Sequence, residues 1–110
     1  MNKLGIAGFA VLTLAIAHPA HAQRVSKMNG MGVLGKCENP VAEQCEAYLV
    51  GFADSESAHQ PKRFCIPVSV GPAEMRDKVV RYLRSRSANL NDSGATQVAR
   101  ALAAAYPCSK

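Results

Sequence analysis

Residues 41–56 read VAEQCEAYLVGFADSE, and this stretch decides the fold class. Its apolar side chains recur at the spacing of one face of an α-helix. The apolar positions are Val41, Cys45, Tyr48, Leu49, Phe52 and Ala53, and the polar positions are Glu43, Gln44, Glu46, Asp54 and Glu56. Pro40 comes just before the stretch, where proline favours the first turn of a helix. The sequence therefore predicts an amphipathic helix that begins at Pro40 and ends near Glu56.

Three other segments carry helical patterns. Residues 26–36 contain three glycines, and each lowers helix stability by about 1 kcal/mol, so we expect a frayed helix with Ser26 as its N-cap. Residues 72–86 carry an apolar stripe of Met75, Val79, Tyr82 and Leu83. A last helix, capped by Asp92 or Ser93, has the inward positions Ala95, Val98, Ala99, Leu102 and Ala103 and ends at Pro107. No alternating strand pattern occurs, so the sequence predicts an all-α domain, a small bundle of about four helices.

The first 22 residues form a separate segment. Met1-Asn2-Lys3 is a short basic start, residues 4–17 are apolar or small apart from Thr13, and Ala20-His21-Ala22 has the small-x-small pattern recognised by signal peptidase. The apolar run is shorter than the roughly 17–25 residues needed to cross a bilayer. We therefore expect residues 1–22 to be a cleaved signal peptide. Residues 23–110 then form a single exported domain without a membrane segment.

All four cysteines, Cys37, Cys45, Cys65 and Cys108, lie in the exported domain. An even number of cysteines in a small exported chain is typical of disulfide bonds, and a domain of this size needs them because its core is small. Cys37 and Cys45 bracket one turn, whereas Cys65 precedes the third helix and Cys108 follows the fourth. These positions favour the pairs Cys37–Cys45 and Cys65–Cys108, while the crossed pairings stay open.

The sequence lacks the patterns of a metal site or an enzyme. His59 is the only histidine after residue 22, and no cysteine pair has zinc-ligand spacing, so neither a metal nor a cofactor is expected. A Cys–His nucleophile needs an unpaired thiolate, which disulfide pairing removes. Glu43 and Glu46 are typical of a solvated helix face, whereas Asp54 would need a partner such as Arg63 if it were buried. We therefore interpret the domain as a binding or structural module and not as an enzyme.

The chain is basic, with 13 Lys and Arg against 8 Asp and Glu. Five of the basic residues belong to the third predicted helix: Arg76, Lys78, Arg81, Arg84 and Arg86. Glu74–Lys78 and Asp77–Arg81 have the spacing and orientation of favourable ion pairs on a helix. Export removes nucleic acid as a partner. The basic helix face is therefore either solvated or bound to an acidic protein.

Four motifs occur in order: Cys45-x2-Tyr48-x2-Gly51-x2-Asp54, Phe64-Cys65-Ile66-Pro67, Val79-Val80-x-Tyr82-Leu83 and Ala104-Ala105-Tyr106-Pro107-Cys108. Between about Cys37 and Cys108 the chain resembles the Rap/Tai family of periplasmic immunity proteins, which protect bacteria against peptidoglycan amidase effectors of type VI secretion. The resemblance implies an all-helical fold with structural disulfides, often in a homodimer. It also implies that the protein inhibits an amidase by occluding the active-site cleft.

The resemblance further implies structural roles for the shared positions, which are Tyr48, Gly51, Asp54, Pro67, Tyr82, Tyr106 and Pro107. Gly51 would permit close helix packing, Asp54 would anchor the Cys65 loop, and Cys65 would be bonded to Cys108.

Inhibitory contacts in this family lie in variable loops, so the candidate binding segments are residues 55–63 and 85–92. The candidate partner-binding residues are His59, Lys62, Arg63, Arg84, Arg86, Asn89 and Asn91. Two other functions stay open: a small periplasmic helical chaperone, and an envelope accessory or scaffold protein without inhibitory activity.

Overall fold

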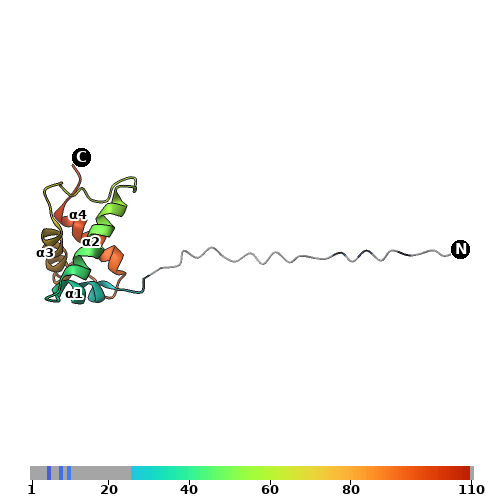
Figure 1. Ribbon diagram of the computed structural model, residues 1–110, viewed down its shortest axis with the longest axis horizontal. Helices are drawn as coiled ribbons and strands as arrows, with labels where there is room; N and C mark the ends of the chain where they lie inside the picture. Colours follow the sequence, from blue (N-terminus) through green and yellow to red (C-terminus); the bar gives the residue numbers. More distant parts are fainter. Residues whose placement is uncertain (1–4, 6–7, 9, 11–25, 110) are drawn as a thin grey trace.

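The computed structural model describes residues 5, 8, 10 and 26–109. Residues 26–109 form four α-helices and no strand: α1 (Gly30–Glu38), α2 (Glu43–Glu56), α3 (Pro72–Leu83) and α4 (Gly94–Ala105) (Figure 1). The prediction of a small all-α bundle is confirmed. The predicted signal peptide lies almost entirely outside the described residues.

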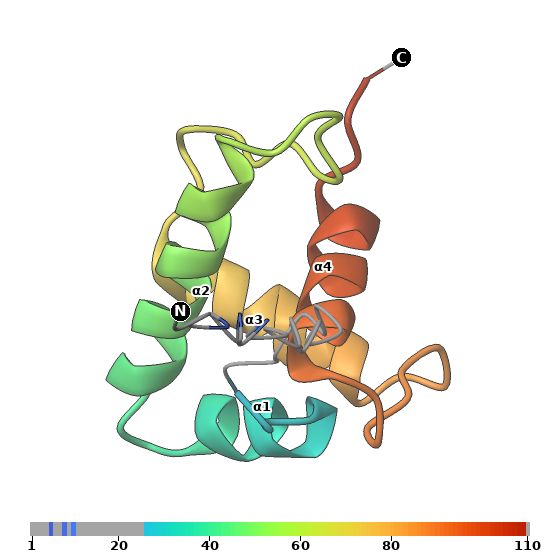
Figure 2. The same cartoon turned by 90° about the vertical axis from the view of Figure 1, so that its right-hand side faces the viewer.

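Helices α1 and α3 each pack against the other three helices. Figure 2 shows α3 between α2 and α4, with α1 lying across one end of the bundle. The loop between α2 and α3 lies at the opposite end, next to the C-terminus. The two predicted binding loops, residues 55–63 and 85–92, therefore lie toward opposite ends of the bundle.

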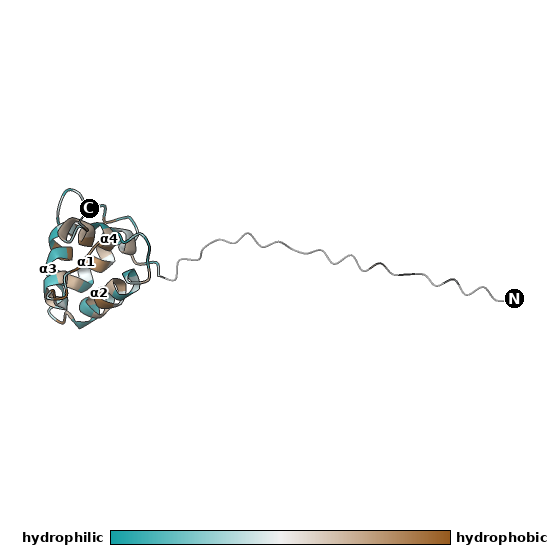
Figure 3. Cartoon of the chain, turned by 90° about the horizontal axis from the view of Figure 1, so that it is seen from above, coloured by the Kyte–Doolittle hydropathy of each residue, from teal (hydrophilic) through white to brown (hydrophobic). Residues whose placement is uncertain are grey.

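The core is formed by one face of each helix, by Phe64 from the α2–α3 loop, and by Tyr106, which directly follows α4. Its buried hydrophobic residues are Val33, Cys37, Cys45, Leu49, Phe64, Met75, Val79, Leu83, Val98, Ala101, Leu102 and Tyr106. Leu49, Val79 and Leu102 are completely buried, and each stabilises the fold by roughly 1.5–3 kcal/mol through removal from water. In Figure 3, α3 is mostly hydrophilic in colour because only a narrow stripe of this helix faces the core.

Two predicted inward positions are wrong. Val41 is 66% exposed because the chain turns before the helix begins: the backbone N–H of Val41 donates to Asn39 Oδ1 at 3.0 Å, and α2 starts only at Glu43. Ala95 is exposed in the first turn of α4. In the first turn of α4, the side of the helix that faces α1 carries the buried Gln97, and Ala95 lies on a different side.

Helix α1 starts later than predicted, with Asn29 as its N-cap instead of Ser26. Asn29 Oδ1 accepts from the backbone N–H of Gly32 at 2.9 Å. Before this cap, the carbonyl oxygen of Met28 accepts from the N–H of Gly94 at 3.0 Å. This close approach requires glycine, because a Cβ on Gly94 would lie 2.8 Å from Val33 Cγ2 and 3.1 Å from Met28 O. Pairing with the start of α4 thus keeps residues before Asn29 out of the helix.

Helix α3 ends at Leu83 and not at Arg86. The carbonyl of Tyr82 would accept from residue 86 in a continuing helix, but it accepts instead from the Ser85 hydroxyl at 2.6 Å and from the Ser85 N–H at 2.9 Å. Serine competes with helix continuation in this way because its hydroxyl is close to the backbone. Arg86 therefore belongs to the loop.

Two disulfide bonds connect separate elements of this bundle. Cys37 is bonded to Cys45, which joins the end of α1 to the first turn of α2. Cys65 is bonded to Cys108, which joins the α2–α3 loop to the C-terminus. These are the pairs that the sequence favoured.

Candidate partner-binding surfaces

The two predicted binding loops lie at opposite ends of α4. The N–H of Cys65 donates to the carbonyl of Tyr106 at 2.9 Å, just after α4 ends. The second loop leads directly into the start of α4 and bonds to α1, since Gly30 N–H donates to Asp92 O at 3.0 Å. A helix of 12 residues is about 18 Å long, so the two loops are separated by roughly that distance. Figure 2 shows the α2–α3 loop at one end of α4 and the α3–α4 loop at the other.

We call residues 57–71 with 106–108 the Cys65 end, and residues 84–93 with the first turn of α1 the Leu90 end. The predicted partner-binding residues divide between them. His59, Lys62 and Arg63 belong to the Cys65 end, whereas Arg84, Arg86, Asn89 and Asn91 belong to the Leu90 end. The structure therefore gives two candidate surfaces in place of one combined site.

The carboxylate that holds the Cys65 end is Glu56, and the role predicted for Asp54 is wrong. Glu56 Oε1 accepts from the backbone N–H of Arg63 at 2.6 Å, and Oε2 accepts from Arg63 Nη2 at 2.8 Å. The Glu56 side chain is only 4% exposed. Asp54 is exposed, because two residues along a helix turn the side chain by about 200°. The last turn of α2 thus presents Glu56 to the loop and Asp54 to solvent.

The Arg63 guanidinium completes this arrangement by packing on two aromatic rings. Its carbon lies 5.5 Å from the centre of Phe52 and 6.0 Å from that of Phe64, which is the distance of a cation–π contact. Hydrogen bonds from Arg63 lower the pKa of Glu56, and this effect exceeds the opposing effect of burial. The loop is therefore fixed at its last residues by a charged pair, and Arg63 is a structural residue as well as a candidate contact.

Beside this pair lies an apolar groove that sequence reasoning missed. The groove has a volume of about 660 Å³. Its apolar lining residues are Val50, Ala53, Phe64, Ile66, Val68, Val70, Pro72 and Met75. The remaining lining residues are Asp54, Glu56, Ser57, Lys62 and Cys65. Val68 is fully exposed. The only signal in the sequence was the alternation of Ile66, Val68 and Val70, which is too short to define a surface.

A buried amide organises the Leu90 end. Gln97 is completely buried; its Oε1 accepts from the backbone N–H of Asn89 at 2.9 Å, and its Nε2 donates to Asp92 Oδ2 at 3.4 Å. Asn89 Oδ1 accepts from the N–H of Asn91 at 3.1 Å, so the Asn89 side chain shapes the turn. Asn91 is exposed. Sequence reasoning missed Gln97 because a polar residue inside an apolar stripe gave no sign of burial.

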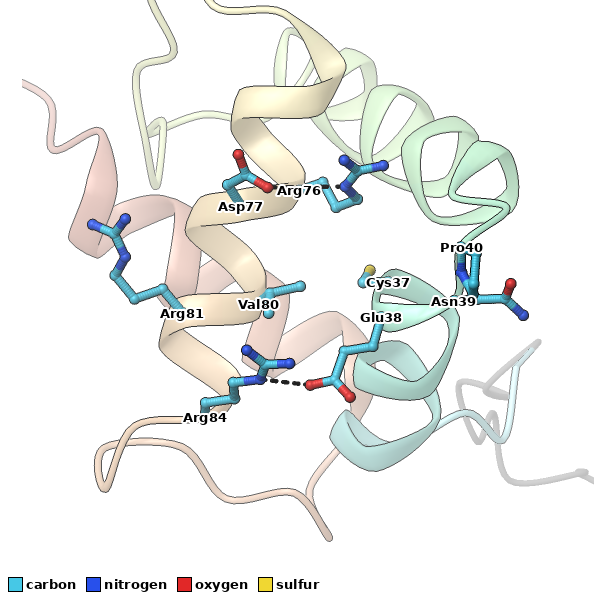
Figure 4. A pocket seen from close by; sticks show the side chains of 9 residues that line it. All are labelled: Cys37, Glu38, Asn39, Pro40, Arg76, Asp77, Val80, Arg81 and Arg84. Carbon is cyan, nitrogen blue, oxygen red and sulfur yellow. Dashed lines mark hydrogen bonds and ion pairs between the residues drawn. The ribbon is translucent and has the colours of Figure 1, made fainter.

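Arg76 on α3 and Arg84, which directly follows α3, form ion pairs with the neighbouring helices. Arg84 Nε donates to Glu38 Oε1 at 2.6 Å, and Arg76 Nη1 donates to Glu46 Oε1 at 3.1 Å. Among the described residues, the predicted pairs Glu74–Lys78 and Asp77–Arg81 are not formed. The acidic partners lie instead on α1 and α2. These pairs border a cavity of about 570 Å³ between α3 and the α1–α2 turn (Figure 4).

Other positions of the predicted structural motif have varied surroundings. Gly51 is exposed, and a Cβ there would meet nothing within 4 Å, so its predicted packing role is wrong.

The Tyr82 hydroxyl donates to Ser87 O at 3.3 Å and thereby stabilises the α3–α4 loop. Burial raises the pKa of Tyr48 and, together with the nearby Glu74, that of Tyr106. Pro67 and Pro107 are exposed on either side of the second disulfide.

The described residues contain no group of three or more His, Cys, Asp or Glu side chains placed to hold a metal ion. Within the same part of the chain, no helix combines the length and hydrophobicity needed to cross a membrane.

The fold and its surfaces define a small helical domain with two disulfides and two separate candidate surfaces. The family model of Rap1a immunity proteins matches residues 29–108, a range that includes all four helices and both disulfides. The chain therefore belongs to the Rap1a immunity protein family, and the resemblance inferred from its motifs is confirmed. A search of curated proteins found no match. Family membership and the disulfides together indicate an exported protein.

Proposed function

We propose that this chain is a periplasmic immunity protein that binds a peptidoglycan amidase effector of type VI secretion and occludes its active-site cleft. The observation that carries the proposal is the match to the immunity family over residues 29–108. Removal of residues 1–22 as a signal peptide would deliver the domain to the periplasm, where disulfides persist. The protein acts by binding and has no catalytic activity of its own.

The form of the domain supports inhibition by a rigid surface. The Cys65 end is fixed by the Cys65–Cys108 disulfide and the Glu56–Arg63 pair. The Leu90 end is fixed by Gln97 and by backbone hydrogen bonds to α1. Loops that are ordered before binding lose less conformational entropy when a complex forms. Since the two ends are about 18 Å apart along α4, we infer that one end enters the cleft and the other stays outside it.

A capture experiment tests the proposal. The mature, oxidised protein is immobilised and exposed to periplasm and to culture medium that contains secreted effectors, and bound proteins are identified by mass spectrometry. We expect recovery of a small Cys–His amidase whose hydrolysis of peptidoglycan stops when the immobilised protein is added in equal amount. Cytochrome c, which is also small and basic, is the control for nonspecific electrostatic capture.

Two results would contradict the proposal. One is recovery of no amidase, and the other is recovery of an amidase that hydrolyses peptidoglycan at an unchanged rate in the complex. Either result would bring forward the chaperone or scaffold function.

A further inference from the structure

The ion pairs of the domain leave its positive charge unevenly distributed. Four arginines have carboxylate partners: Arg63 with Glu56, Arg76 with Glu46, Arg84 with Glu38, and Arg100 with Asp92. In the part of the chain that the structure describes, six cations have no such partner: Lys27, Lys36 and Lys62, which are far apart in the sequence, and three that are close together, Lys78, Arg81 and Arg86. These three cations follow one another on the second half of α3 and the start of the next loop.

Together with Arg84, they form what we call the basic patch: Lys78, Arg81, Arg84 and Arg86. Residues three apart on a helix are neighbours, so Lys78, Arg81 and Arg84 lie along one side of α3. The acidic residues of this helix, Glu74 and Asp77, lie in its first half. The second half of α3 therefore carries excess positive charge. Figure 4 shows the Arg81 side chain, which lines the cavity, directed away from the carboxylate of Glu38.

Glu38 fixes Arg84 through its Nε atom and leaves the two terminal nitrogens of the guanidinium available for binding. Its Nε donates to Glu38 Oε1 at 2.6 Å, while the side chain is 63% exposed. A guanidinium has five N–H donors, and within the described residues Arg84 Nη1 and Nη2 donate to no other group. Two terminal nitrogens in a plane match the two oxygens of a carboxylate. Glu38 thus fixes the direction of a side chain that can still bind an acidic group.

At the Cys65 end, Lys62 is the only described Lys or Arg without a carboxylate partner. The Arg63 guanidinium there is neutralised by Glu56, and Lys62 and Asp54 both line the adjacent groove. That groove is otherwise apolar. The larger number of unpaired cations favours the second half of α3, with the start of the next loop, as the part of the domain that meets an acidic partner.

We propose that the basic patch is a docking surface for an acidic face of the effector, on which clustered Asp and Glu side chains pair with Arg81, Arg84 and Arg86. This inference rests on the proposed function, because it assumes that the partner is a protein effector. Complementary charge across an interface raises the association rate and selects the partner. The patch thus gives the domain a means to capture its effector quickly.

A purely structural role makes a different prediction. Cations near the C-terminus of a helix stabilise it by about 0.3–1 kcal/mol through the helix dipole. If this were their whole role, replacing Arg81 would lower thermal stability and leave binding unchanged.

The first test needs no effector. The mature, oxidised protein, labelled with 15N, is titrated with hexaglutamate and, as a control, with hexalysine. We expect hexaglutamate to shift the amide resonances of residues 78–87, and we expect 0.5 M NaCl to abolish the shifts. Equal shifts at Lys62, or no shifts, would overturn the assignment of the patch. Binding of the same residues to phosphatidylglycerol vesicles but not to hexaglutamate would also overturn it, because the partner would then be a lipid surface.

The second test compares two variants with the same change in charge. Arg81→Glu alters the basic patch, and Lys62→Glu alters the opposite end. Against the amidase recovered by capture, we expect Arg81→Glu to lower the association rate constant by about tenfold at low salt, and Lys62→Glu by less than twofold. Arg81→Lys should restore most of the rate. Thermal unfolding of each variant separates a loss of binding from a loss of folding.

The outcomes distinguish the two proposals. If an amidase is captured and Arg81→Glu binds it at the wild-type rate, the docking surface is wrong and the proposed function stands. If no amidase is captured, the proposed function is wrong, and the hexaglutamate titration alone decides whether the patch binds acidic groups.

Discussion

The two loops that connect α2 to α3 and α3 to α4 are both ordered, but by different interactions. The α2–α3 loop is held by the Cys65–Cys108 disulfide and by the ion pair of Glu56 with Arg63. The α3–α4 loop is held by the buried side-chain amide of Gln97 and by backbone hydrogen bonds to the start of α1. The Cys65 end is therefore sensitive to reductant and to acid, whereas the Leu90 end depends on close packing.

The largest effect should follow removal of the Cys65–Cys108 disulfide. The bond closes a loop with a sequence separation of 43, and its loss costs about 4 kcal/mol on the chain-entropy estimate. In a Cys65→Ser, Cys108→Ser variant, we expect hydrogen exchange to accelerate in residues 57–71 more than at Gly30 and Met31. Denaturant unfolding and exchange mass spectrometry measure the two effects. Equal acceleration at both ends would show that the ends are not independent.

The matching change at the Leu90 end is Gly94→Ala. The new methyl group would lie within 3.1 Å of the Met28 carbonyl oxygen, and backbone cannot move away as cheaply as a side chain. We expect a loss of about 1–3 kcal/mol in the free energy of unfolding, with no change in sensitivity to reductant. An unchanged midpoint of urea unfolding would contradict the close approach of residue 28 to α4.

A third change, Glu56→Gln, tests the acid sensitivity of the Cys65 end. Loss of the charged hydrogen bonds to Arg63 should cost roughly 1–2 kcal/mol at neutral pH. Because the pKa of Glu56 is lowered in the folded state, its contribution is present above the unfolded pKa of about 4.3 and is lost as the pH falls through the folded value. The unfolding free energies of wild type and variant, measured from pH 7 to pH 2, should therefore converge in acid. Parallel curves over this range would show that Glu56 is not the titrating group.

The smallest effect, and one of opposite sign, is expected for Gly51→Ala. A methyl group there meets nothing within 4 Å, and alanine favours a helix over glycine by about 0.8–1 kcal/mol. This variant should raise the thermal midpoint by a few degrees and is the natural control for Gly94→Ala. A destabilised Gly51→Ala would restore the packing role that the family motif implied for this residue.

Periodicity predicted α2, α3 and α4 and their share of the core, since Cys45, Leu49, Val79 and Leu102 are buried as their spacing requires. The positions of the cysteines favoured the observed disulfides. The ends of helices were less predictable, because the start of α1 depends on hydrogen bonds to residues 90–94, which are distant in sequence.

Sequence alone also could not predict which of the two carboxylates at the end of α2, Asp54 or Glu56, is buried against the loop. Both are acidic residues in the last turn of α2, and the family motif contains only Asp54. The position of Phe64 and Arg63 after the loop decides which carboxylate is covered, and that position comes from tertiary structure. Gln97 was missed for a related reason, because its partners are backbone groups that carry no signature in the sequence.

The positions at which the chain enters and leaves the domain also determine how the protein should be handled. Residue 28 is bonded to Gly94 at the Leu90 end, whereas Cys108 is bonded to Cys65 at the other end. An affinity tag joined just before residue 26 would therefore lie at the Leu90 end, and a C-terminal tag at the Cys65 end. Immobilisation through each terminus in turn would mask one surface at a time, which makes the orientation on the sensor chip itself an assay for the binding face.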